Sequence, residues 1–141
     1  MTSLRFGGSV WCNLDIALRK VDEIYKQEIK ELNLKVIEWY ILRELYEQDG
    51  QMPSHLAKAV GRPPTSFTPI LDQLEAKALI ERRVHPSDRR GVKIFLTAKG
   101  KALRPQIQTV AENIEKKLSQ QITDKDWQGY EHVLENFQTL N

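Results

Sequence analysis

Residues 88–97 constrain the fold of this chain more than any other stretch. They place three charged residues and a glycine directly before an alternation of apolar and polar side chains. The apolar residues from Val92 to Leu96 recur with period two, which predicts a short strand with those side chains on one face. The segment 79–84 can supply the second arm, so we expect a β-hairpin whose exposed tip is Asp88–Gly91.

Positive charge is concentrated around this hairpin. Between Glu81 and Arg104 eight lysines and arginines stand against two acidic residues, although the net charge of the whole chain is only +2. From Asp15 to Asp49 the acidic residues outnumber the basic ones. A basic block inside a nearly neutral chain indicates a local anionic partner. A rigid hairpin with arginines at its tip suits a narrow, electronegative DNA groove, whereas the alternative is a solvated charged turn.

Length and composition limit the number of domains and the cellular location of the protein. A chain of 141 residues can bury a core as one domain, or as a core with helical extensions. Its single cysteine excludes an intramolecular disulfide framework and favours a reducing compartment. No apolar run approaches the roughly 20 residues of a membrane span, and residues 1–8 do not resemble a signal peptide. We therefore expect a cytoplasmic protein.

Apolar spacing and capping residues predict a mainly α fold with a small β-hairpin. Short helices are expected on either side of a turn at Gly61-Arg62-Pro63-Pro64, which is a helix-turn-helix pattern. Thr97 is expected to cap one long helix, and residues 123–126 form a capping-box pattern before the last one. The helices are expected at 9–31, from about 36 to a stop at Asp49-Gly50, at 53–60, 65–77, from 97 onward, and from 123 onward. This order predicts a winged helix-turn-helix with helical extensions at both ends.

Two apolar faces bear on how these elements pack. The helix at 65–77 is expected to bury Phe67, Ile70, Leu71 and Leu74, with Ala78 beside them. The first helix carries a near-heptad apolar seam from Trp11 to Leu32, and the last carries Trp127, Tyr130, Leu134 and Phe137. The seam of the first helix is compatible with either core packing or an oligomer interface.

The segments 71–83, Asp88-Arg89-Arg90 and 94–100 together resemble the MarR family of transcription regulators. The family's signature is an Asp-x-Arg wing tip followed by a strand that ends in Leu-Thr. The resemblance implies a sequence-specific DNA-binding regulator, expected to be a repressor, that binds a pseudo-palindromic operator as a homodimer. It also implies a winged helix-turn-helix DNA-binding domain at 35–97 and a helical dimerisation region formed by 1–34 and 98–141.

Carried over by position, the resemblance places DNA contacts on two helices and the hairpin. Arg90 is expected to enter the minor groove, and Asp88 to orient its guanidinium through a bidentate pair. Short hydroxyl side chains can bond phosphates or base edges, and Gln73 can read adenine. The expected contact residues are Ser54, His55, Thr65, Ser66, Thr68, Gln73, Asp88, Arg89 and Arg90.

Some positions depart from the family pattern. Pro63-Pro64 replaces residues that in many relatives include a serine. Asp72 is acidic, which would weaken phosphate contact. Residues 68–71 look most like a branch that senses hydroperoxides through an N-terminal cysteine, so peroxide sensing through Cys12 is an alternative. Alignment with that branch nevertheless places Trp11 in register, and Ile16 stands where a tyrosine is expected, which favours an inert Cys12 thiol.

The sequence also bears on other classes of function. An aromatic group formed by Tyr25, Trp39 and Tyr40 could line a pocket for a small aromatic ligand, although core packing would also explain it. The three histidines at 55, 85 and 132 are too scattered to predict a metal site, and no cofactor is expected. The sequence contains no nucleophile–base pair or glycine-rich phosphate loop, so an enzyme is not expected. A winged-helix module that binds only proteins remains an alternative, although it would not need Arg89 and Arg90.

Overall fold

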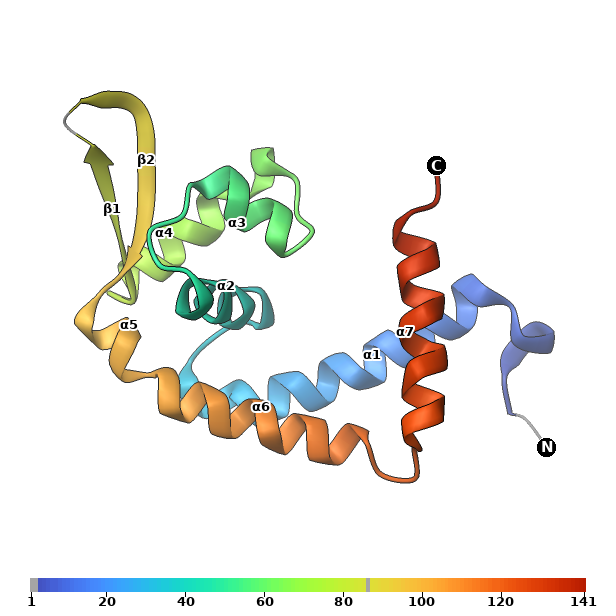
Figure 1. Ribbon diagram of the computed structural model, residues 1–141. Helices are drawn as coiled ribbons and strands as arrows, with labels where there is room; N and C mark the ends of the chain where they lie inside the picture. Colours follow the sequence, from blue (N-terminus) through green and yellow to red (C-terminus); the bar gives the residue numbers. More distant parts are fainter. Residues whose placement is uncertain (1–2, 86) are drawn as a thin grey trace.

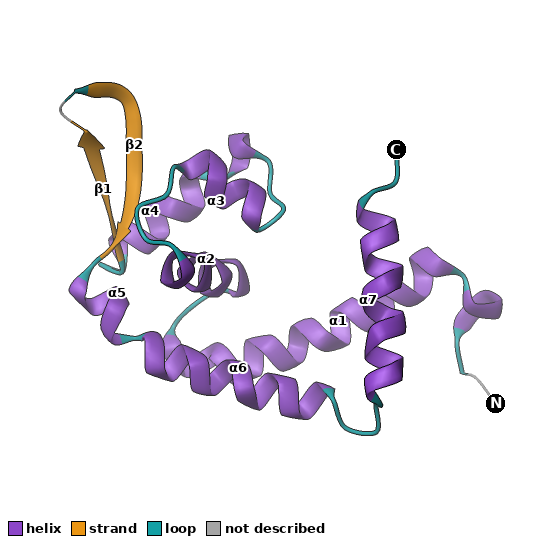
Figure 2. Cartoon of the chain, in the orientation of Figure 1, coloured by secondary structure: helices purple, strands orange, loops and turns teal. Residues whose placement is uncertain are grey.

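The computed structural model describes residues 3–85 and 87–141; the side chains of His85 and Asp88–Arg90 lie outside the described part. The elements form a compact group around α2 and an extended pair, α1 and α6, beneath it (Figures 1 and 2). In chain order they are η1 (Arg5–Gly8), α1 (Val10–Ile29), η2 (Lys30–Leu32), α2 (Val36–Glu47), α3 (Pro53–Ala59), η3 (Pro64–Ser66), α4 (Thr68–Ala76), β1 (Ile80–His85), β2 (Asp88–Leu96), α5 (Ala98–Ala102), α6 (Arg104–Leu118) and α7 (Asp124–Gln138).

The two strands form the expected antiparallel hairpin, which we call the wing. Ile80 pairs with Leu96 at its base, and the pairing continues outward to a register shift after Val84. Gln51 adds a short bridge to Ile94, so the segment after α2 lies along the wing's inner edge. Helices α2, α3 and α4 complete a winged helix-turn-helix, and the predicted fold class is confirmed.

One apolar core joins this domain to the long helices. Trp39, Leu42 and Leu45 of α2 are fully buried because the apolar residues of this helix recur at helical spacing over a broad face. Ile29 of α1 and Ile107 of α6 belong to the same cluster. The buried part of the core also contains Leu34, Ile41, Leu56, Ala57, Phe67, Leu71, Leu74, Leu79, Ile80, Ile94, Leu96 and Ile114.

The turn after α2 brings the wing back to the core. Gly50 has φ +73°, a left-handed conformation that favours glycine, and a Cβ there would lie 2.7 Å from the ring of Phe95. The Asp49 carboxylate accepts a hydrogen bond from the backbone N–H of Leu96 at 2.8 Å. The predicted stop at Asp49-Gly50 therefore also fixes the end of β2.

The observed bounds of two helices differ from the predicted ones because of prolines. The helix expected at 65–77 begins at Thr68, and the preceding residues form the 3₁₀ turn η3. Pro69 has no N–H, so it cannot make the bond to the Thr65 carbonyl that a continuous helix would need. The single long helix expected after Thr97 is likewise divided into α5 and α6, because Pro105 cannot donate to the carbonyl of Lys101.

Two further expectations are wrong at the ends of elements. Ala78 is exposed rather than buried, because it adopts φ +61° and ends α4 as a left-handed residue. Its N–H donates to Glu75 O at 2.9 Å, and the next N–H, of Leu79, donates to Leu74 O. At the wing, Asp88 and the two arginines after it belong to β2 rather than to the connecting turn.

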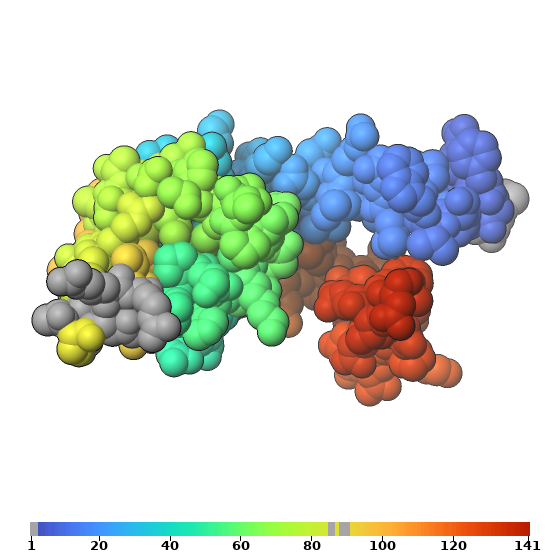
Figure 3. All heavy atoms as spheres, turned by 90° about the horizontal axis from the view of Figure 1, so that it is seen from above, coloured from blue at the N-terminus to red at the C-terminus, as the bar shows by residue number. Residues whose placement is uncertain are grey.

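The last helix begins at the predicted capping box. Thr123 Oγ1 accepts from the N–H of Asp126 at 3.1 Å, and Asp126 Oδ2 accepts from the N–H of Thr123 at 3.0 Å. These bonds to the Thr123 backbone and side chain lower the pKa of the Asp126 carboxyl. From above, α7 stands apart from α3 and the turn that follows it (Figure 3). None of its described residues is fully buried within the protomer.

Candidate nucleic-acid interface

The helix-turn-helix is built from a short helix, a left-handed glycine and a second helix. Pro53 occupies the first turn of α3, where its missing N–H costs little. Gly61 has φ +68°, and the following N–H, of Arg62, donates to Ala57 O at 2.8 Å to close the turn. Leu56 and Ala57 hold α3 on the core. The outer ends of both helices are thereby left at the surface.

The side chains expected to contact DNA from this motif are all exposed. Thr65 and Ser66 lie on η3, ahead of α4, whereas Thr68 and Gln73 lie on α4 itself. The Ser66 hydroxyl donates to Pro63 O at 3.1 Å, so it keeps lone pairs to accept but its proton is engaged. Together η3 and α4 present three exposed hydroxyls and an exposed amide.

The start of α3 offers side chains, but not the His55 backbone N–H, for a phosphate contact. Ser54 and His55 are both exposed, as a phosphate contact requires. The backbone N–H of His55, however, donates to Met52 O at 3.0 Å. That donor is already satisfied, so a contact from His55 would have to come from its imidazole ring.

The described part of the wing presents two exposed basic side chains, Arg83 and Lys93. The Arg83 guanidinium lies 4.2 Å from the centre of the Phe95 ring, and it also pairs with Glu81. Lys93, opposite Arg83 in the hairpin, is exposed. The side chains of Asp88, Arg89 and Arg90, which carry the wing-tip prediction, lie outside the described residues.

A charge network that sequence reasoning missed joins the wing to α4. Arg82 Nη2 donates to Asp72 Oδ1 at 2.7 Å, and Arg82 Nη1 donates to Glu75 Oε1 at 2.8 Å. The negative charge of Asp72 is therefore compensated within the protein. The pairing spans ten residues across a turn and a strand, so no local periodicity could have indicated it.

The aromatic group predicted from the sequence is a single cluster. Trp39 meets Tyr25 and Tyr40 edge-on, with ring centroids 5.7 and 4.9 Å apart. The Tyr40 hydroxyl donates to the Tyr25 hydroxyl at 3.1 Å. Burial, followed by this hydrogen bond, raises the pKa of Tyr40 above its usual range. Tyr40 therefore keeps its hydroxyl proton to higher pH than an exposed tyrosine does.

Trp39 and Tyr25 face a cavity of about 550 Å³ between α1, α2, α6 and α7. The Trp39 indole N–H is buried and has no hydrogen-bond partner among the described residues, and the Arg43 guanidinium lies 4.7 Å from the Trp39 ring centre. The carboxylate of Glu115 also lines the space. Aromatic surfaces, an unused donor and charges of both signs thus meet at one cavity.

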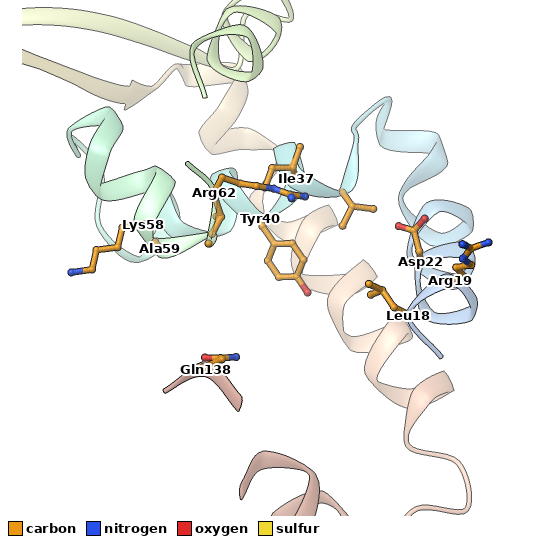
Figure 4. A pocket seen from close by; sticks show the side chains of 12 residues that line it. Leu18, Arg19, Asp22, Ile37, Tyr40, Lys58, Ala59, Arg62 and Gln138 are labelled. Atoms are coloured by element: carbon orange, nitrogen blue, oxygen red, sulfur yellow. The ribbon is translucent and has the colours of Figure 1, made fainter. Parts of the chain in front are cut away.

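Tyr40 lies on a second cavity, of about 890 Å³, instead (Figure 4). Its walls come from α1, α2 and the end of α3, with Gln138 of α7 on the far side. Arg19, Lys58 and Arg62 bring positive charge to the rim. The three predicted aromatic residues therefore adjoin two cavities rather than one.

The structure also bears on a reactive cysteine, a metal site and a membrane span. Cys12 is a free, half-buried thiol on α1. Within residues 3–85 and 87–141 no three histidine, cysteine, aspartate or glutamate side chains gather as a metal site would require. No helix in that part of the chain is long and apolar enough to cross a bilayer.

Comparison with known proteins identifies the domain. Residues 34–92 match the model of the MarR family. This part of the chain is similar to MarR-family domains. The matched segment runs from the junction before α2 to the middle of β2, and so includes both helices of the helix-turn-helix.

Solved structures of MarR-family type share the fold over nearly the whole chain. BpsR of Bordetella bronchiseptica, described with regulation of its DNA binding by 6-hydroxynicotinic acid, is 21% identical, with 99% of this chain and 100% of that one covered and a TM-score of 0.87. The repressor CouR, bound to a 23-mer DNA duplex, is 22% identical over 97% of each chain, with a TM-score of 0.85. A mutant of MarR from E. coli with operator DNA is 24% identical over 88% and 89%, with a TM-score of 0.80.

Proposed function

We propose that this protein is a sequence-specific DNA-binding transcription regulator, acting as a repressor on a pseudo-palindromic operator. The observation that carries the proposal is the set of exposed hydroxyl and amide side chains on η3 and α4, beside a basic wing, in a segment that matches the MarR-family model. In this arrangement α4 is the recognition helix, and the wing follows the DNA backbone into the adjacent minor groove.

We assign base and phosphate contacts to different parts of this surface. Gln73 and Thr68 on α4 would reach base edges, while Thr65, Ser66, Ser54 and His55 would meet the backbone. From the sequence, Arg90 is proposed to enter the minor groove with Asp88 orienting it, and Arg89 to contact phosphate.

We further propose that the regulator is a homodimer. Trp11 and Leu18 on α1 are 78% and 66% exposed, and Tyr130 on α7 is 51% exposed. Large apolar side chains exposed together on neighbouring helices favour a protein interface. A twofold dimer would present two recognition helices to two half-sites of the operator.

A small aromatic ligand is proposed to control DNA binding from the cavity beside Trp39. The unused Trp39 N–H would donate to an acceptor on the ligand, and Arg43 would pair with an acidic group. The proposal is supported by BpsR, whose DNA binding is regulated by 6-hydroxynicotinic acid, an aromatic acid. Thermal unfolding with a series of aromatic acids tests it, with Arg43→Gln as the variant expected to lose the ligand's stabilising effect.

Selection of genomic DNA fragments on the purified full chain tests the central proposal. We expect enrichment of fragments that share an inverted repeat, and weaker binding of those fragments by Gln73→Ala and Arg90→Ala. Recovery of fragments without a common site would contradict sequence-specific binding and favour the alternative of a protein-interaction module.

The alternative of peroxide sensing through Cys12 has its own test. We expect Cys12→Ser to bind the selected operator as the parent protein does and to respond equally to an organic hydroperoxide, because the thiol is half-buried and Ile16 stands where that mechanism expects a tyrosine. Release of the parent protein by hydroperoxide that is lost in Cys12→Ser would establish the alternative.

A further inference from the structure

We infer that Arg82 is a positioning residue that holds the wing at a fixed angle to α4, an inference that rests on the DNA-binding function proposed above. Its two terminal nitrogens bond two different carboxylates, Asp72 at 2.7 Å and Glu75 at 2.8 Å. Asp72 and Glu75 stand three positions apart, so they share a face of α4. One planar guanidinium held at two points cannot slide along the helix or turn about a single bond.

Arg82 lies where its contact with α4 sets the orientation of the outer part of the wing. Below it, Leu79 and Ile80 are buried with Leu74 of α4, so the base of the hairpin is fixed by apolar packing. Above it, Val84 is 61% exposed. Among the described residues, the side-chain hydrogen bonds between the wing strands and α4 are those of Arg82. A small rotation here is magnified along the strand toward the tip.

The charges involved argue for a role in orientation rather than in attraction. Asp72 and Glu75 add two negative charges to the helix that would face DNA, and by long-range electrostatics alone these charges oppose binding. The Arg82 side chain is 26% exposed, whereas those of Asp72 and Glu75 are 59% and 44% exposed. Ion pairs with such exposed partners contribute little to folding. Their main consequence is therefore geometric.

Removing the two carboxylates separates electrostatic repulsion of DNA from orientation of the wing, because the two effects change operator affinity in opposite directions. If only charge mattered, Asp72→Asn/Glu75→Gln would bind the operator more tightly. A clamp that orients the wing predicts about three- to tenfold weaker binding, since a loosened wing loses conformational freedom when it meets DNA. Glu47→Gln is the matched control, because this exposed carboxylate of α2 has no ion pair with any described residue and its removal should leave binding equal or slightly tighter.

Variants of Arg82 itself give a second, graded readout. Arg82→Gln should weaken operator binding about tenfold, while Arg82→Lys should recover part of it, because a lysine can bridge to one carboxylate but lacks the planar fork. The free energy of unfolding should change little in either variant. A merely structural role would instead make affinity and stability fall together.

A measurement without DNA distinguishes failure of this inference from failure of the proposed function. Spin labels at Val84→Cys and Ala76→Cys, in a Cys12→Ser background, report the distance between the wing and the end of α4. We expect a narrow distribution with Arg82 and a broader one in Arg82→Gln. Unchanged distributions, or equal or tighter operator binding by Asp72→Asn/Glu75→Gln, would overturn the inference, whereas absence of any DNA binding by the parent protein would refute the proposed function alone.

Discussion

Glu38 holds the junction between the long helices and the winged helix-turn-helix through a buried charge. Its carboxylate is fully buried and accepts from Lys77 Nζ at 2.6 Å and from the N–H of Lys35 at 2.8 Å. Lys77, next to the last residue of α4, also donates to Asn33 O at 2.8 Å. Helix α4 is thereby tied to the segment that links α1 to α2.

Lys77→Met is expected to lower the free energy of unfolding by about 3 kcal/mol, because it leaves a buried carboxylate without its counter-charge. Urea unfolding measures the change. Replacing both partners, as Glu38→Leu/Lys77→Met, should recover most of the loss. Lys20→Met is the control, since the Lys20–Glu23 pair is exposed and should contribute less than about 1 kcal/mol. Equal losses in the two single variants would contradict this account.

At the scale of elements, a glycine sets how closely α5 approaches the base of the wing. A Cβ on Gly100 would lie 2.2 Å from the carbonyl oxygen of Leu79, so the backbones would have to separate. Gly100→Ala should therefore destabilise the fold by about 1–3 kcal/mol. Gly129→Ala in α7 is the matched control: its Cβ would meet nothing within 4 Å, and the added helix propensity should stabilise by up to about 1 kcal/mol. Thermal unfolding of both variants tests the contrast.

The same region predicts a dependence of stability on pH. The Tyr46 hydroxyl of α2 donates to Gly100 O at 2.6 Å, and burial raises the pKa of Tyr46 to about 12 from 10.0. The folded state keeps this proton to higher pH than the unfolded chain does. Its contribution is therefore complete below pH 10 and is lost as the pH rises toward about 12. Urea unfolding over this range should show a shallower decline in Tyr46→Phe; identical slopes would contradict the assignment.

Elements were predictable where the signal is local. Period-two alternation indicated β2, and the capping box at 123–126 marked the start of α7 to the residue. Pro69 and Pro105 were visible in the sequence, but their effect depended on which carbonyl each would have had to reach. The Arg82 clamp and the buried Glu38–Lys77 pair were not predictable, because each joins residues that only the completed fold brings together.

For the candidate site, the sequence predicted the exposed residues of the helix-turn-helix better than it predicted the cavities and the buried polar groups. Thr68 and Gln73 were placed correctly on the exposed side because helical spacing separates them from Leu71 and Leu74. The aromatic residues were correctly grouped, yet their division between two cavities depends on where α3 and α7 pack. The unused Trp39 N–H had no sequence signal, since hydrogen-bond satisfaction is a property of the packed core.

At the scale of the whole molecule, α1 and α7 each carry an exposed apolar stripe. Trp11, Leu14 and Leu18 recur at helical spacing along α1, and all are exposed. On α7, Tyr130, Val133 and Phe137 repeat the same spacing and are also exposed. Figure 1 places α7 and the first half of α1 away from the winged domain. Covering both stripes with a second copy would bury them at once.

This geometry predicts that a charge on the α1 stripe separates the subunits without unfolding them. Leu14→Glu should sediment as a monomer at micromolar concentration and keep its helical circular dichroism, because Leu14 is 46% exposed and outside the core. Its affinity for a full operator should fall to that for one half-site, because linking two half-sites raises the effective concentration of the second contact. Val84→Glu, an exposed change on the wing, should remain dimeric in the same sedimentation experiment. A parent protein that sediments as a folded monomer, or a Leu14→Glu protein that stays dimeric, would show that these stripes do not form a dimer interface.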